Sequence, residues 1–223
     1  MEEFHALLVE GVPGIGKSTL IDALIRRHVS SSEERRIRSF VHLAQTHTYG
    51  PLAPAEDAGT LTVADNLRLL DRIVAMLEWL REQLRYSGKP CFVLVDSLHL
   101  THCVRPGVVA WSDVAPIDRR LAAAGCKLLL LKGSDETIRT RTIEARAGSQ
   151  FLAEYALRFG RTHEELRAHF VREQAAFLGM FEKSAMQKRV CENDRDLDTI
   201  VAGVFDFWRP SQEAPGRFLT ANA

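Results

Sequence analysis

A glycine-rich segment near the N-terminus carries a lysine and two hydroxyl side chains at fixed spacing. Residues 10–19 have the sequence EGVPGIGKST, which matches G-x-x-x-x-G-K-[ST] at every fixed position. Glycines let backbone N–H groups turn toward one point, a lysine adds positive charge, and a serine hydroxyl is a ligand for Mg²⁺. This set of groups indicates a site for a nucleoside triphosphate. The residues expected to hold its phosphates are Gly11, Val12, Pro13, Gly14, Ile15, Gly16, Lys17, Ser18 and Thr19, and Ser18 also binds the metal ion.

A second chemical signal is the carboxylate that ends an apolar run. The run at residues 92–95 is FVLV, and Asp96 follows it directly. An acid at the end of a strand beside a phosphate-binding loop is placed to hold Mg²⁺ or to accept a proton from a substrate hydroxyl. We expect Asp96 to do one of these. The alternative interpretation is that its side chain only caps the following loop.

Arginines are concentrated after a later apolar run, between residues 132 and 161. Phosphoryl transfer spreads negative charge over the γ-phosphate oxygens, so a mobile segment that brings in arginines favours it. The main candidates are Arg141 and Arg146, followed by Arg139 and Arg158. The alternative is a solvated helix face on which these arginines pair with glutamates.

Polar side chains that suit an acceptor follow the second and third apolar runs. Ligands of open α/β sheets bind at the carboxyl ends of strands. Gln45, His47 and Tyr49 occupy such a place and are candidates to hydrogen-bond to, or stack on, a ring. The alternative is a loop that packs under a long helix. His99 and His102 lack a third metal ligand nearby, so we expect one of them, His99, to line the acceptor pocket.

The elements that position these residues follow an alternating order. Five strand candidates cover residues 4–9, 38–43, 91–95, 127–131 and 188–191, and the third and fourth are continuously apolar. Helical spacing covers residues 20–28, 62–86, 113–124, three segments within 134–187, and 197–208. This alternation predicts a doubly wound α/β sheet.

Length and composition limit the classes of protein. The chain has 223 residues and a formal net charge of zero, with 29 basic and 29 acidic side chains, which gives no overall field for nucleic acid or a membrane. No apolar run approaches a membrane span, and no signal sequence is evident. Four cysteines without paired spacing favour reduced thiols and a cytoplasmic location. We expect one domain over residues 1–210 and a loose tail at 211–223.

Absent motifs narrow the nucleotide-binding classes further. Ser97 stands where motor and remodelling ATPases have a second acid, and no aspartate has a glycine three residues later, as the GTPase switch requires. Residues 193–196 are NDRD, which lacks the lysine of N-K-x-D. Thr19 replaces the third glycine of a dinucleotide-binding turn. A phosphotransferase remains.

Taken together, the motifs resemble the P-loop nucleoside and nucleotide kinases, in particular the thymidylate kinase and deoxynucleoside kinase group. Residues 10–11 are similar to the E-G that opens the phosphate loop of this group. Residues 134–136, followed by Arg141 and Arg146, are similar to its S-P-E helix and arginine-bearing lid. Residues 193–197 lie where the group passes from the fifth strand to the last helix.

The resemblance implies a P-loop fold of three layers, α/β/α, with a five-stranded parallel sheet in the order 2-3-1-4-5. It also implies a helical lid at about residues 134–165, ATP with Mg²⁺ as the donor, and often a homodimer. Asn193 and Arg195 would lie beside the adenine, and Glu10 on the substrate side.

Two departures concern the acceptor. The group has Asp-Arg or Glu-Arg-Ser where this chain has Asp96-Ser97, so an arginine toward the substrate is missing, and Arg105 is the candidate to replace it. The segment after the second strand also lacks the group's acidic and proline-containing signature. We therefore expect an ATP-dependent kinase that phosphorylates a hydroxyl or a phosphate of a nucleoside-like acceptor. A kinase of an antibiotic or other secondary metabolite, and a nucleotide-dependent binding module without transfer, stay as alternatives.

Overall fold

The computed structural model describes residues 4–30, 39–87, 90–104 and 109–208, and its centre is one parallel β-sheet. All four strand pairings are parallel, in the order β2-β3-β1-β4-β5. The strands are β1 (Phe4–Glu10), β2 (Ser39–Leu43), β3 (Cys91–Asp96), β4 (Lys127–Lys132) and β5 (Gln187–Glu192). The five-stranded parallel sheet in the order 2-3-1-4-5 is confirmed.

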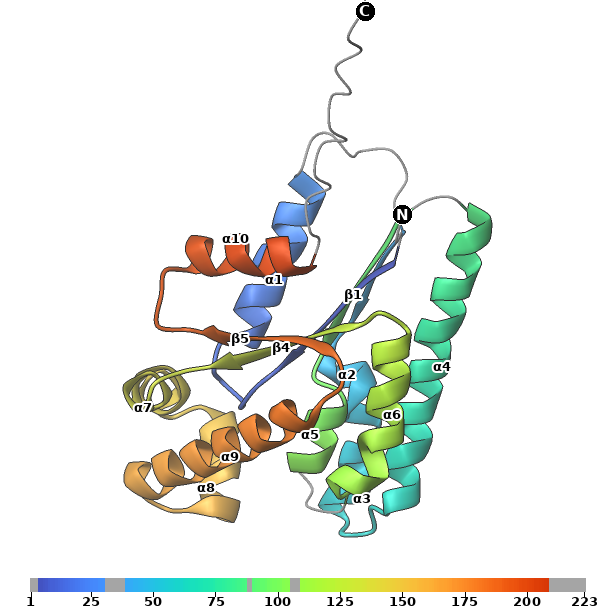
Figure 1. The fold of residues 1–223 in the computed structure, drawn as a ribbon. Helices are drawn as coiled ribbons and strands as arrows, with labels where there is room; N and C mark the ends of the chain where they lie inside the picture. Colours follow the sequence, from blue (N-terminus) through green and yellow to red (C-terminus); the bar gives the residue numbers. More distant parts are fainter. Residues whose placement is uncertain (1–3, 31–38, 88–89, 105–108, 209–223) are drawn as a thin grey trace, which may run out of the picture.

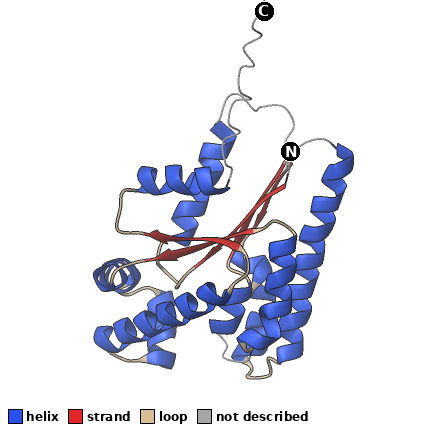
Figure 2. Cartoon of the chain, in the orientation of Figure 1, coloured by secondary structure: helices blue, strands red, loops and turns tan. Residues whose placement is uncertain are grey.

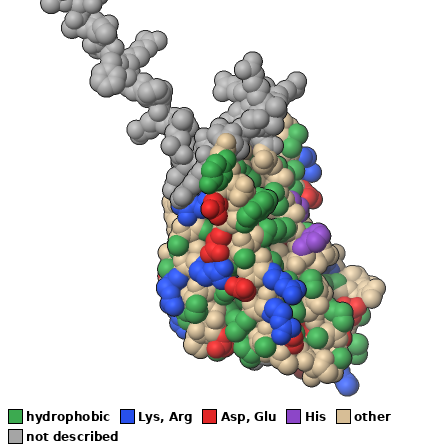
Figure 3. All heavy atoms as spheres, turned by 90° about the vertical axis from the view of Figure 1, so that its right-hand side faces the viewer, with side chains coloured by type: hydrophobic (Ala, Val, Ile, Leu, Met, Phe, Trp, Pro, Cys, Tyr) green, Lys and Arg blue, Asp and Glu red, His purple; other side chains and the backbone are tan. Residues whose placement is uncertain are grey.

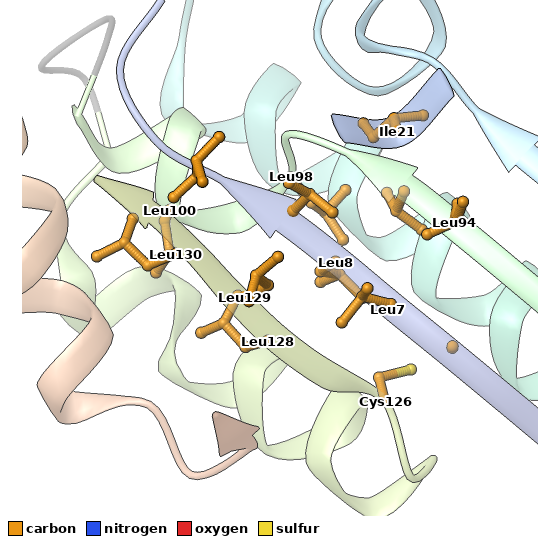
Figure 4. Packing of buried hydrophobic residues seen from close by; sticks show 14 of the residues in the cluster. Leu7, Leu8, Ile21, Leu94, Leu98, Leu100, Cys126, Leu128, Leu129 and Leu130 are labelled. Carbon is orange, nitrogen blue, oxygen red and sulfur yellow. The ribbon is translucent and has the colours of Figure 1, made fainter. Parts of the chain in front are cut away.

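The three central strands are apolar on both faces because helices cover both. In β1, β3 and β4 nearly every side chain is buried, whereas the edge strands β2 and β5 are partly exposed. Figure 4 shows Leu7 and Leu8 of β1 beside Leu128 and Leu129 of β4, with Leu94 of β3 close by. This core holds the carboxyl ends of the strands in a fixed register.

Two helix layers enclose the sheet (Figures 1 and 2). On one side α1 (Lys17–Ser30) packs against α10 (Leu197–Trp208), and on the other α4 (Val63–Ser87) packs against α6 (Trp111–Ala123). The indole N–H of Trp208 donates to the carbonyl of His5 at 2.9 Å, which anchors α10 to β1. The three-layer architecture agrees with the expectation.

Shorter elements gather at the carboxyl end of the sheet, in the lower part of Figure 1. After β2 come α2 (Gln45–Thr48), a 3₁₀ turn (Gly50–Leu52) and α3 (Ala53–Asp57), and after β3 comes α5 (His99–Val104). After β4 come α7 (Asp135–Thr137), a π-helix η3 (Ile138–Ile143), a 3₁₀ turn η4 (Glu144–Arg146), α8 (Gln150–Phe159) and α9 (His163–Lys183).

The strands and long helices lie close to the predicted ranges, but the connections differ. The segment expected as a polar loop after β2 contains the short helices α2 and α3, and α5 was not predicted at all. Helices this short carry too few apolar repeats for a periodic signal. The expected tail at residues 211–223, and residue 38 of the second predicted strand, lie outside the described residues.

Figure 3, which faces the side where α4 lies, shows basic and acidic side chains interspersed with scattered hydrophobic ones. Among the described helices, none is long and apolar enough to cross a membrane. All four cysteines are free thiols, and Cys91, Cys103 and Cys126 are buried.

Candidate active site

The loop between β1 and α1 depends on glycine at three positions. Gly11, Gly14 and Gly16 have φ angles of 144°, 80° and 103°, in the region that side chains disfavour. A Cβ atom on Gly11 would collide with the carbonyl oxygen of Leu131, and one on Gly16 would lie 2.8 Å from the amide nitrogen of Asn193. The loop therefore follows a path open to glycine, and its backbone runs close to β4 and to the loop after β5.

Lys17 begins α1 and turns back over this loop. It is buried, and its ammonium group donates to the carbonyls of Gly11 at 2.8 Å and Val12 at 3.2 Å. The next two side chains, Ser18 and Thr19, are exposed. A loop with N–H groups at the start of a 14-residue helix, a lysine and two hydroxyls has the donors that phosphate oxygens and Mg²⁺ require. The residues present therefore fit ATP and its metal ion.

Asn193 supports the loop from the side of β5. Its side-chain amide donates to the carbonyl of Ile15, and its backbone N–H donates to the carbonyl of Lys132 at 2.8 Å. The side chain is buried and lies behind the loop. The sequence had predicted a place beside the adenine. Arg195, the other residue predicted there, is exposed.

Asp96 ends β3 beside this loop, because β3 pairs with β1 so that Asp96 is the partner of Val9. Its carbonyl accepts the hydroxyl of Thr48 at 2.8 Å, and its Oδ1 accepts the hydroxyl of Ser97 at 3.0 Å. Ser97 has a φ of 59°, which is rare for a residue other than glycine. The carboxylate is therefore held by its neighbours, and 8% of the residue is exposed.

A cleft of about 320 Å³ joins these groups. It is lined by Pro13, Gly14, Gly16, Lys17, Ser18, Thr19, Gln45, Asp96, Arg146 and Phe151. The lining comes from the phosphate loop, the start of α2, the end of β3 and the predicted lid segment. Phe151 was not predicted, since a phenylalanine in an amphipathic helix has no signal that separates it from a core residue.

Of the predicted lid arginines, Arg146 is the one that lines the cleft. A Cβ atom added to Gly14 would lie 3.2 Å from its Nε, and its guanidinium lies 4.8 Å from the ring centre of Phe151. Arg141 is exposed, and its charge acts on Asp194 in the loop after β5. The structure therefore places Arg146 against the phosphate loop and leaves Arg141 outside the cleft lining.

Two further arginines form ion pairs. Arg139 pairs with Glu136 and Glu144, as the alternative interpretation expected. Arg158 on α8 pairs with Asp57 at 2.7 Å and lies 3.6 Å from Glu56, both near the end of α3. The predicted lid segment is therefore connected directly to the segment that follows β2.

Glu10 does not line the cleft. Its carboxylate is fully buried and accepts the N–H groups of Leu98 at 2.8 Å and Leu100 at 3.1 Å and the hydroxyl of Thr101 at 2.6 Å. Burial raises the pKa of Glu10, and these hydrogen bonds oppose that shift. The carboxylate that was predicted to contact substrate instead connects β1 to the start of α5 through these hydrogen bonds.

The predicted acceptor residues lie in different environments. Gln45 lines the cleft, and His47 is exposed on α2. Tyr49 is buried, and its hydroxyl donates to Glu56 at 2.6 Å. His99 is fully buried, and its Nε2 lies 3.0 Å from Asp118, so it connects α5 to α6. The sequence had predicted that it lines the acceptor pocket. Arg105 lies outside the described residues.

His102 was given no role from the sequence, and in the structure both of its ring nitrogens lie within hydrogen-bond distance of a partner. Its Nε2 lies 2.9 Å from the carbonyl of Thr48, and its Nδ1 lies 3.0 Å from Oδ1 of Asn66 on α4. Burial lowers the pKa of His102 to about 4, so the ring is neutral at pH 7. His102 thus joins α5 to α2, whose Thr48 holds the carbonyl of Asp96.

Comparisons with known proteins show the fold. No family model matches the chain, and no curated protein matches it in sequence. Among solved structures, an unliganded sugar kinase from Janibacter sp. HTCC2649 has a TM-score of 0.50 with 17% identity, over 92% of this chain and 94% of that one. The chain therefore has a kinase-like α/β fold.

Proposed function

We propose that the protein is an ATP-dependent small-molecule kinase. The observation that carries this proposal is one cleft that contains the glycine-rich loop with Lys17 and Ser18, the Asp96 carboxylate, and Arg146. In this arrangement the loop N–H groups and Lys17 would hold the phosphates of ATP. Ser18 would hold Mg²⁺, which neutralises charge on the phosphates when bound, and Asp96 would act as the base for the acceptor.

The acceptor would be a hydroxyl on a molecule with a planar polar ring, such as a nucleoside. Among the described residues that line the cleft, two are positively charged, Lys17 and Arg146, and both lie against the phosphate loop. A phosphate on the acceptor would instead meet the carboxylate of Asp96, which favours a neutral hydroxyl. Gln45 and Phe151 supply an amide and an aromatic face suited to a ring.

The proposed reaction transfers the γ-phosphoryl group of ATP to the acceptor oxygen. The acceptor oxygen forms a bond to the γ-phosphorus, and the bond from that phosphorus to the oxygen bridging the β- and γ-phosphates breaks. ADP leaves, and the acceptor proton passes to the carboxylate of Asp96. Arg146 would stabilise the charge on the transferring group.

The test is a screen for ATP consumption with Mg²⁺ over nucleosides, their monophosphates, sugars and other hydroxylated metabolites. We expect turnover with a hydroxyl acceptor, loss of turnover in Lys17→Ala, and a large decrease in kcat in Asp96→Asn. Turnover of a monophosphate with its nucleoside inactive would contradict the hydroxyl assignment. ATP binding without acceptor-dependent turnover across the panel would favour a binding module over a kinase.

A further inference from the structure

The residue after Asp96 has a conformation that needs an explanation. Ser97 has a φ of 59°, in the left-handed region. Residues other than glycine, asparagine and aspartate adopt this conformation at a cost in free energy. Such a conformation persists only where surrounding contacts hold it. The N–H of Ser97 donates to the carbonyl of Val9 at 3.0 Å, which attaches the turn to β1.

This turn directs the hydroxyl of Ser97 back onto the preceding side chain. The hydroxyl donates to Oδ1 of Asp96 at 3.0 Å, and Ser97 is 1% exposed, so the bond is shielded from water. Asp96 itself lines the cleft. One carboxylate oxygen is therefore engaged by Ser97, which leaves the second oxygen to serve a ligand.

Three more bonds fix the same turn. The hydroxyl of Thr48 holds the carbonyl of Asp96, and the carboxylate of Glu10 accepts the N–H groups of Leu98 and Leu100 just beyond it. The backbone on both sides of Ser97 is thus bound to β1 and α2. The side chain of Asp96 can still rotate, and among the described residues the hydrogen bond from Ser97 holds its carboxylate.

We propose that Ser97 is a positioning residue that orients the Asp96 carboxylate toward the acceptor. The proposal rests on the kinase function proposed above, and it assigns to Ser97 a role through Asp96 without direct contact with substrate. An oriented carboxylate loses less freedom when the acceptor binds, and this raises the rate of proton transfer from the acceptor hydroxyl to Asp96. The effect should therefore appear in kcat more than in the KM for ATP.

Two variants separate the hydroxyl from the strained backbone. Ser97→Gly removes the hydroxyl and relieves the φ strain, whereas Ser97→Ala removes the hydroxyl and keeps the strain. We expect kcat to decrease about 10-fold in both, with unchanged binding of a fluorescent ATP analogue. Ser97→Thr, which keeps a hydroxyl, should recover part of the rate if its thermal unfolding shows that it folds.

A double-variant cycle with Asp96→Asn tests whether Ser97 acts through Asp96. If it does, Ser97→Gly should lower the residual kcat of Asp96→Asn by less than twofold. An equal 10-fold loss in both backgrounds, or a full wild-type rate in Ser97→Gly, would overturn the proposal. These results differ from failure of the proposed function, in which the wild-type protein itself shows no acceptor-dependent turnover.

Discussion

The proposed phosphate loop takes its groups from residues 11–19, whereas the rest of the cleft takes Gln45, Asp96, Arg146 and Phe151 from three distant segments. In the loop, neighbouring residues form the site, and glycine conformations with the start of α1 determine its shape. On the other side, which we call the acceptor side, each group depends on a separate contact. The difference teaches that a local motif can specify the proposed donor site, while the proposed acceptor site needs the assembled sheet and helices.

The largest expected effect concerns the phosphate loop. Lys17→Ala should lower kcat roughly 10³-fold or more, because it removes the loop's buried ammonium group. The measurement is steady-state turnover with the acceptor found in the screen, together with thermal unfolding. Lys132→Ala is a matched control, since Lys132 pairs with Glu192 on the adjacent strand β5, and it should retain near wild-type kcat. A comparable loss in both variants would mean that the loop lysine has no special role.

The second effect concerns stability on the acceptor side. Burial lowers the pKa of His102 to about 4 from an ordinary value of 6.5. As pH falls below 6.5 the unfolded chain binds a proton that the folded chain excludes, so stability is lost progressively until about pH 4. The loss should reach roughly 3 kcal/mol.

Urea unfolding at a series of pH values from 7 to 4.5 checks this expectation. His102→Gln should be less stable than the wild type at pH 7 and should lose less stability on acidification. His47→Gln, which changes an exposed histidine of α2, is the control and should follow the wild-type curve. Parallel curves for the wild type and His102→Gln would contradict the assignment.

The third effect separates two arginines of the lid segment. Arg146→Ala should lower kcat on the order of 10²-fold, because Arg146 lies against Gly14 in the cleft. Arg139→Ala should stay within about twofold, since Arg139 is exposed and paired with Glu136 and Glu144. Steady-state kinetics of the two purified variants decide this, and equal rates would remove Arg146 from the proposed chemistry.

The smallest effect concerns the ion pairs between α8 and α3. Arg158→Ala breaks an exposed ion pair with α3, whose Glu56 also accepts the hydroxyl of Tyr49. We expect the KM for the acceptor to rise about two- to fivefold with an unchanged KM for ATP, as suits a pair worth under about 1 kcal/mol. Arg167→Ala, which breaks pairs with Asp135 and Glu164, is the control. A rise confined to the KM for ATP would contradict the link.

Much of the fold was accessible from local patterns. The apolar runs that become β3 and β4 are buried on both faces, and the long helix α4 has the spacing of an amphipathic helix. The order of the sheet came from a family resemblance, because strand periodicity gives no information on which strands pair. The short helices α2, α3 and α5 were beyond prediction, since their ends are held by tertiary bonds such as those of His102 and Glu10.

The site divides in the same way. The proposal that residues 11–19 bind phosphate could be made from spacing alone, because adjacent residues of one loop and helix point at one place whatever the remaining fold does. The roles of Glu10, His99 and Asn193 could not, since a buried carboxylate, imidazole or amide takes its function from the donors and acceptors that meet it. Ser97 is the clearest case. Its type is ordinary in the sequence, and only the folded turn directs its hydroxyl onto Asp96, because that geometry depends on contacts with β1 and α2.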